Sequence, residues 1–174
     1  MSGFYWQGHI NLEEHGYNTE YQSFDYVRQP IKESEIETWQ SQGYTHENWS
    51  GVMYDSTNPM PLWVRSVGKA IYGHLEGDCG YVLYCMKTGE IMPRHIDHYE
   101  TYSRVFGINR DNIVRTLMFL EDWSPGHYFD IGNSTNMPWH AGDYWQWSAD
   151  VPHSASNIGI KNRWTLQITG PKEG

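Results

Sequence analysis

The chain has 174 residues, of which 39% are hydrophobic and 16% aromatic, and this length suits a single domain, residues 1–174, with a buried core. Its formal net charge of −9 argues against nucleic-acid binding, which depends on Lys and Arg side chains that neutralise phosphates. No stretch approaches the roughly 18 consecutive apolar residues of a membrane span, so no membrane partner is expected.

The first part of the chain is predicted to form an extended and helical layer over residues 1–76. Its opening segment, MSGFYWQGHINLEE, lacks the basic and then apolar runs of a secretory signal, so a cytoplasmic location is expected. A first helix is predicted between Pro30 and Gly43, because proline near the start and glycine past the end are typical helix punctuation. A second helix is predicted in PLWVRSVGKAIYGHL, where apolar residues recur every four positions.

Residues 77–170 have a different pattern, which predicts a mainly β body. Short runs rich in β-formers, among them GYVLYCMK, HIDHYETYSRVFG, IVRTLMFLED, GHYFDIG, AGDYWQWS, HSASNIG and RWTLQITG, are separated by turn signals such as KTGE and HAGD. Strands at such regular spacing are typical of a β-sandwich or barrel. The predicted fold class is therefore mainly β with N-terminal helices.

The segment HIDH contains two histidines and an aspartate within four residues. Side chains alternate faces along a strand, so His95 and Asp97 are expected to point the same way and His98 the opposite way. A third metal ligand must come from elsewhere, and the best candidate is His153, which opens a later strand run. Two imidazoles and one carboxylate leave three open positions on a metal, the arrangement of non-haem Fe(II) oxygenases. A fortuitous His-x-Asp pair is the alternative in a chain with nine histidines.

A second cluster follows ten residues after this histidine, in NRWTLQITG. On a strand, Arg163, Thr165 and Gln167 share one face, while the apolar residues between them share the other and can pack against helices. A guanidinium with a neighbouring hydroxyl suits a bound carboxylate. The alternative for Arg163 is a surface arginine.

Together these features resemble the Fe(II)/2-oxoglutarate-dependent oxygenase superfamily. The resemblance rests on His-x-Asp in GEIMPRHID, on TLMFLEDW, on HAGDYWQW before His153, and on Arg-x-Thr about ten residues later. It covers roughly residues 80–170, and the pattern in GEIMPRHID, the run TLMFLEDW and the segment HAGDYWQW that follows it are similar to the prolyl-4-hydroxylase-like branch. The prolyl hydroxylases proper usually carry Lys where this chain has Arg163. The implied fold is a double-stranded β-helix, a cupin-like jelly roll with helices packed on one sheet.

The resemblance implies specific roles for these residues. His95, Asp97 and His153 would be the iron ligands and so the catalytic centre, while Arg163 and Thr165 would hold the far carboxylate of 2-oxoglutarate. With O2 as the second cosubstrate, the implied reaction hydroxylates a substrate and converts 2-oxoglutarate to succinate and CO2.

Two tyrosines are further candidates for cosubstrate contacts. Tyr99 shares the face of the His-x-Asp pair if that strand continues, and Tyr84 lies on the preceding strand. A core role is the alternative for both tyrosines.

Three further features have open interpretations. Residues 121–139 form a long Gly- and Pro-containing segment, which suggests a lid whose Trp123, His127 and Trp139 contact substrate; a structural aromatic cluster is the alternative. Arg115, in a strand run, is expected to form a surface ion pair or to pair with a cavity carboxylate. The same holds for Arg104.

The leading functional hypothesis is a hydroxylase acting on a peptide or protein residue or on a small metabolite. A cupin-type metal enzyme without 2-oxoglutarate, such as an isomerase or a dioxygenase using O2 alone, is the first alternative. A non-catalytic jelly-roll binding module is the second. The late Arg-x-Thr distinguishes the leading hypothesis from the cupin alternative.

Overall fold

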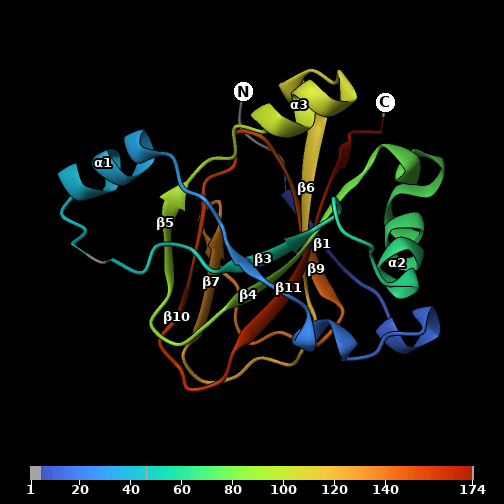
Figure 1. The fold of residues 1–174 in the computed structure, drawn as a ribbon, viewed down its shortest axis with the longest axis horizontal. Coiled ribbons are helices and arrows are strands. Elements are labelled where there is room, and N and C mark those ends of the chain that lie inside the picture. The colour runs from blue at the N-terminus through green and yellow to red at the C-terminus, as the bar shows by residue number, and fades with distance from the viewer. Residues whose placement is uncertain (1–4, 46, 174) are drawn as a thin grey trace.

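The computed structural model describes residues 5–45 and 47–173 (Figure 1). Its strands are β1 (Tyr5–His9), β2 (Val27–Arg28), β3 (Val52–Asp55), β4 (Gly80–Met86), β5 (Ile91–His95), β6 (Ile113–Phe119), β7 (His127–Ile131), β8 (Ser134–Thr135), β9 (Asp143–Ser148), β10 (His153–Asn157) and β11 (Arg163–Pro171). Its α-helices are α1 (Glu33–Ser41), α2 (Leu62–Tyr72) and α3 (Glu100–Phe106), and short 3-10 turns span Leu12–His15, Glu20–Ser23, Gly73–Asp78 and Arg110–Asn112. Within the described ranges, no helix is long and apolar enough to cross a bilayer.

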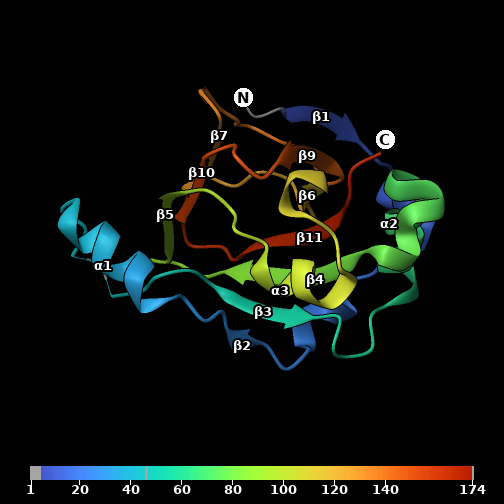
Figure 2. The same cartoon turned by 90° about the horizontal axis from the view of Figure 1, so that it is seen from above.

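The strands form two antiparallel sheets that face each other. One sheet has seven strands in the order β1-β9-β6-β11-β4-β3-β2, and the other has four in the order β5-β10-β7-β8. Figure 2 shows the larger sheet as a stack of strands with β5, β10 and β7 standing to one side of it. This crossing-over of successive strands between two sheets is a double-stranded β-helix, which confirms the predicted mainly β fold class.

The outer face of the larger sheet is covered by α2 (Figure 1). Trp63, Val64 and Val67 on this helix are buried in one cluster with Leu166 and Ile168 of β11. The pattern of apolar residues every three or four positions thus forms the helix face that packs on the sheet. Both predicted helices are confirmed, but α1 lies beside the β5 end of the smaller sheet instead of on the larger one.

The space between the two sheets is filled mainly by aromatic side chains. Phe119 of β6, Phe129 of β7 and Trp147 of β9 are each no more than 1% exposed and belong to one cluster. Because β6 and β9 are neighbours in the larger sheet and β7 lies in the smaller one, this cluster holds the two sheets together. The candidate site lies at one end of this inter-sheet space.

The segment after HIDH is not the strand that its β-forming residues predict. Residues 100–106 form α3, which begins after Tyr99 in a left-handed conformation (φ 55°) and ends at Gly107, also left-handed (φ 68°). Tyr102 and Phe106 lie one turn apart, with ring centroids 4.6 Å from each other, so contacts along the helix outweigh β propensity here. Arg104 therefore lies on a helix, not on a strand.

The N-terminal part of the chain contributes strands as well as helices. β1 pairs with β9 at one edge of the larger sheet, and β3 pairs with β4 near the other edge. Residues 5–9 thus form a regular strand within the part that was predicted to be extended and helical. The predicted division after residue 76 marks a change of sequence pattern. Strands from both sides of it belong to the larger sheet.

Strand β5 forms one edge of the smaller sheet, and its outer side is already occupied. The N–H of Ile91 donates to the Asn48 carbonyl, and the Ile91 carbonyl accepts from the Ser50 N–H. Pro93, two residues on, has no N–H to donate. Among the described residues, the backbone pairing on this side of β5 therefore consists of one bridge, between Ile91 and the loop before β3.

Candidate metal centre

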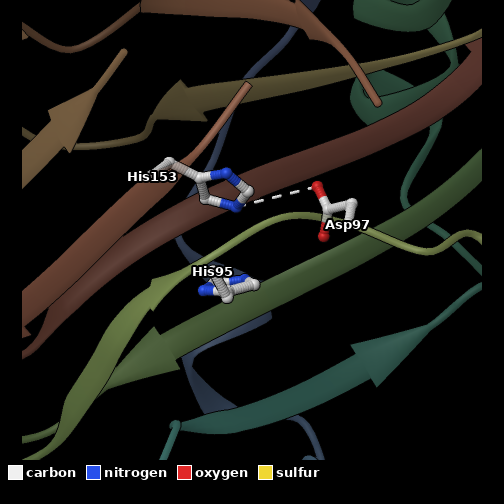
Figure 3. Close-up of side chains that lie close together, drawn as sticks. All are labelled: His95, Asp97 and His153. Atoms are coloured by element: carbon white, nitrogen blue, oxygen red, sulfur yellow. Dashed lines mark ion pairs between the residues drawn. The ribbon is translucent and has the colours of Figure 1, made fainter. Parts of the chain in front are cut away.

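The three predicted metal ligands converge at the end of the inter-sheet space (Figure 3). His95 is the last residue of β5 and His153 the first of β10, and their Cα atoms are cross-strand partners. One potential ligand atom from each of His95, Asp97 and His153 lies within 4.8 Å of the other two. Asp97 lies beyond the end of β5, so the loop before α3, not strand alternation, directs its carboxylate toward the two imidazoles.

Backbone carbonyl groups fix the orientation of both imidazoles. His95 Nδ1 lies 2.8 Å from the Pro93 carbonyl oxygen, and His153 Nδ1 lies 3.1 Å from the Val151 carbonyl oxygen. A carbonyl only accepts, so each Nδ1 must carry the hydrogen, and in the neutral form of such an imidazole the lone pair is on Nε2. This is the tautomer that binds a metal through Nε2.

Local charges keep the set in its metal-binding protonation state. Burial lowers the pKa of His153 to about 4, against the opposing effect of Asp97, so this imidazole is neutral at pH 7. Burial alone would raise the pKa of Asp97, but Arg115 and the two histidines outweigh it and hold that pKa well below its usual range. His153 therefore offers a neutral nitrogen donor and Asp97 an anionic oxygen donor.

The metal-free protein is expected to lose stability as the pH falls from 6.5 toward 4. Unfolded His153 takes up a proton near its ordinary pKa of 6.5, but folded His153 does so only near 4. The unfolded state therefore binds more protons in this window, and acidification favours it by up to about 3 kcal/mol. Urea denaturation with a chelator present measures this loss. His153→Gln should show a flatter pH dependence, and identical slopes in both proteins would contradict the assignment.

Arg163 is buried at the other end of the same space, with no carboxylate of the described residues forming an ion pair with it. It opens β11 opposite Met86, is 2% exposed, and its Nη1 lies 3.7 Å from the Met86 sulfur. Its Nε and Nη2 find no hydrogen-bond partner in the part of the chain that the structure describes. The guanidinium carbon lies 5.5 Å from the Phe119 ring centroid and 5.8 Å from that of Trp139. Burial lowers the pKa of Arg163 to about 10, so it remains charged at pH 7.

A cavity of about 70 Å³ connects this arginine to the three ligands. Its lining includes Tyr84, whose hydroxyl lies 3.0 Å from Ser50 Oγ and whose pKa burial raises to about 12. Thr165 lies opposite Tyr84 in the sheet register, and its buried Oγ1 has no partner among residues 5–45 and 47–173. The three candidate ligands, Arg163 and Tyr84 thus line one interior cavity, and Thr165 lies on the strand next to Tyr84.

Tyr99, the other tyrosine predicted to contact the cosubstrate, does not line this cavity but contacts the carboxylate of Asp97. The Tyr99 hydroxyl donates to Asp97 Oδ2 at 3.1 Å, and Arg115 Nε lies 3.6 Å from the same oxygen. A surface ion pair and a pair with a cavity carboxylate were the two predictions for Arg115. The structure has the second, because Arg115 pairs with Asp97. The available signal was its place on β6, where it shares a strand face with Leu117 and Phe119, two buried core residues.

Comparison with known proteins identifies the fold. Neither a family model nor the sequence of a curated protein matches the chain. A prolyl-4-hydroxylase from Pseudomonas putida is similar in structure, with 13% identity, a TM-score of 0.61, and coverage of 99% of this chain and 95% of that one. The non-haem alpha-ketoglutarate-dependent carbocyclase SnoK from nogalamycin biosynthesis has 12% identity, a TM-score of 0.53, and coverage of 95% and 87%. The chain has an Fe(II)/2-oxoglutarate oxygenase-like fold.

Within this oxygenase-like fold, residues 121–139 are not an open loop. They contain β7 and β8, and Trp139 stacks on Phe119 with ring centroids 3.8 Å apart. His127 Nε2 lies 2.9 Å from the Lys161 carbonyl oxygen, and the Trp123 indole donates to the His127 carbonyl at 2.9 Å. These side chains form the structural cluster that was the alternative, and Trp139 forms part of the wall around Arg163.

A larger hollow of about 610 Å³ reaches two of the candidate metal ligands, His95 and Asp97, from outside. Its walls come from α1, including Glu35 and Trp39, and from α3, including Phe106. His95, Asp97 and Arg115 line both this hollow and the inner cavity. The ligand set therefore stands between a narrow interior compartment and a wide outer one.

Proposed function

We propose that the protein is a non-haem Fe(II)- and 2-oxoglutarate-dependent dioxygenase that hydroxylates a small metabolite or a residue of a peptide or protein. One observation carries the proposal. A single cavity has two imidazoles and a carboxylate at one end, and at the other a buried arginine that has no counter-ion among the residues that the structure describes.

The ligand set fits iron. Two neutral imidazoles and one carboxylate match the donor preferences of ferrous iron and leave three positions open. When bound with 2-oxoglutarate and O2, iron would supply the oxidative chemistry that gives succinate, CO2 and a hydroxylated substrate. The protein's own part is to orient His95 and His153 through backbone carbonyls that accept from Nδ1, which leaves Nε2 as the ring nitrogen available to the metal.

The other end of the cavity fits the far carboxylate of 2-oxoglutarate. A buried charge without a partner costs several kcal/mol, which a carboxylate would offset through charge-assisted hydrogen bonds. Arg163 has two nitrogens free for this role, Nε and Nη2. The hydroxyl of Thr165, buried without a partner among the described residues, is a further donor on the same strand face. Tyr84, which lines the cavity, offers a phenol from the neighbouring strand.

Arg163 also separates this proposal from its alternatives. A cupin-type enzyme that uses O2 alone, or an isomerase, needs the metal ligands but has no use for a buried cation opposite them. A binding module needs neither the aligned imidazoles nor the arginine. A ligand that carries a second anionic group into the cavity would explain why a charged arginine is buried there.

The outer hollow supports a small substrate or a single side chain. Its volume of about 610 Å³ lies within the range of small-molecule sites, roughly 300–1,000 Å³. Tyr81, Tyr102 and Phe106 give it aromatic walls, which suit a substrate with apolar surface. Such a substrate would approach the iron from the side opposite Arg163.

Anaerobic titration tests the proposal. Adding Fe(II) and 2-oxoglutarate together to the wild-type protein should produce a visible charge-transfer band. The reason is that one oxygen of the 1-carboxylate and the 2-keto oxygen would together chelate the metal. Fe(II) alone should give no such band, and neither should Fe(II) with succinate, which lacks the keto group. Absence of the band with both components would refute the proposed function.

A further inference from the structure

Two side chains, those of Tyr99 and Arg115, interact with the carboxylate of Asp97. The sequence patterns assigned neither of them to this carboxylate. Tyr99 donates its hydroxyl hydrogen to Asp97 Oδ2 at 3.1 Å, and Arg115 Nε lies 3.6 Å from the same oxygen. The side chains of Asp97 and Arg115 are only 16% and 18% exposed. Their interaction is therefore weakly screened by solvent.

Arg115 is itself fixed in place, so its charge has a defined position. It lies within β6, with Thr169 of β11 and Trp147 of β9 as its cross-strand neighbours. Its Nη1 donates to Gln167 Oε1 at 2.9 Å, and its guanidinium carbon lies 5.3 Å from the centroid of the Tyr99 ring. A strand in the middle of a sheet and two side-chain contacts hold the cation against the carboxylate.

The backbone at Tyr99 is adapted to the same arrangement. Tyr99 adopts a left-handed conformation with φ 55°, which is uncommon for a bulky residue. Strained conformations of this kind cluster at functional sites. Here the conformation allows the Tyr99 ring to turn back so that its hydroxyl reaches Asp97, two residues earlier.

We propose that Arg115 is a positioning residue of the metal centre whose fixed positive charge, acting through Asp97, stabilises bound iron in its ferrous state. Tyr99 assists by a hydrogen bond to the same oxygen. This inference rests on the proposed function only in taking the metal to be iron, and it requires no 2-oxoglutarate.

The physical basis is electrostatic. Oxidation adds one positive charge to the metal, and a nearby fixed cation makes that change less favourable. A carboxylate that already interacts with a cation and a hydroxyl donates less electron density to the metal, which acts in the same direction. In air, one electron would leave the ferrous ion, which becomes ferric, and O2 would accept that electron and become superoxide. Arg115 opposes this loss.

The test compares two substitutions that differ in charge. The midpoint potential of the bound Fe(III)/Fe(II) couple and the rate of air oxidation are measured without 2-oxoglutarate in wild type, Arg115→Gln and Arg115→Lys. Arg115→Gln should lower the potential and speed oxidation by about tenfold. Arg115→Lys, which keeps the charge, should stay close to wild type. Arg104→Gln, on exposed α3, is the matched surface control and should change neither quantity.

Tyr99→Phe gives an independent measurement if Arg115→Gln does not fold. It removes the hydrogen bond to Asp97 but keeps the ring, and should lower the potential by a smaller amount in the same direction. A wild-type potential in Arg115→Gln would overturn the inference. An equal drop in the Gln and Lys variants would also overturn it, since geometry and not charge would then be responsible. A protein that holds iron but gives no 2-oxoglutarate band would refute the proposed function and leave this redox test intact.

Discussion

Arg163→Met is expected to make the metal-free protein more stable and, at the same time, to abolish its binding of 2-oxoglutarate. The guanidinium is 2% exposed, and two of its nitrogens lack partners among the described residues. A methionine of similar length would fill the space between the aromatic rings without carrying a buried charge. We expect the free energy of unfolding to rise by about 1–3 kcal/mol. The affinity for 2-oxoglutarate should fall by at least about 100-fold, because its far carboxylate would be buried without a cation.

Two measurements check this opposite pair of effects. Urea denaturation without metal gives the stability, and the 2-oxoglutarate dependence of the charge-transfer band gives the affinity. Arg104→Met, which removes an exposed arginine from α3, is the matched control and should change the stability by less than about 0.5 kcal/mol. A destabilised Arg163→Met protein would mean that the arginine has a structural role that its contacts do not reveal. Unchanged affinity would remove Arg163 from the cosubstrate site.

His95→Ala is expected to abolish the charge-transfer band at any concentration of 2-oxoglutarate. The substitution removes one of three ligands whose donor atoms lie within 4.8 Å of one another. Changes in residues that only support a ligand typically cost 10–100-fold in metal affinity, so loss of a ligand should lower Fe(II) affinity by more than about 100-fold. Anaerobic calorimetry with Fe(II) measures this directly.

The control for His95→Ala is three residues away. His98 has a side chain that is 52% exposed, and its Nε2 lies 3.9 Å from Glu35 Oε1 on α1. His98→Ala should bind Fe(II) as the wild type does and keep the band. Equal losses in the two variants would show that the segment, and not the His95 imidazole, is what the metal requires.

Much of this architecture follows from local patterns in the sequence. Short β-forming runs between turn signals correspond to β4, β6, β7, β9, β10 and β11. Period-two alternation correctly separated the two faces of β11, because β11 is a regular strand between two partners. Ile168 and Leu166 pack under α2, while Arg163 faces the cavity. Local geometry determines these features, so a local pattern is sufficient to find them.

The rule that side chains alternate along a strand does not hold after His95, because β5 ends at this residue. The strand ends there, and Asp97 reaches the site through a loop whose course depends on the left-handed Tyr99 and on α3. The grouping of His95 with Asp97 was right, but alternation was not its cause. Thr, Tyr, Val and Phe in ETYSRVF favour strands, but Tyr102 stacks on Phe106 along the helix and the chain turns at Gly107.

The role of Arg115 could not be derived from any segment taken alone. Its contact with Asp97 joins β6 to the loop after β5, and its contact with Gln167 joins β6 to β11. Such contacts depend on which strands become neighbours and in which register. The aromatic residues of 121–139 illustrate the same limit, because the buried Trp139 stacks on Phe119 of β6, a residue of another strand.

The outer edge of β5 has a consequence for how separate molecules meet. An open strand edge next to a metal site would invite a second chain to pair with it and, by repetition, to build fibres. Here Ile91 is already bonded to the Asn48 and Ser50 backbone, and Pro93 has no N–H, while its carbonyl lies within hydrogen-bonding distance of His95 Nδ1. The contact between His95 Nδ1 and the Pro93 carbonyl orients a candidate metal ligand. It also occupies a backbone acceptor that a second chain would need in order to pair with this edge.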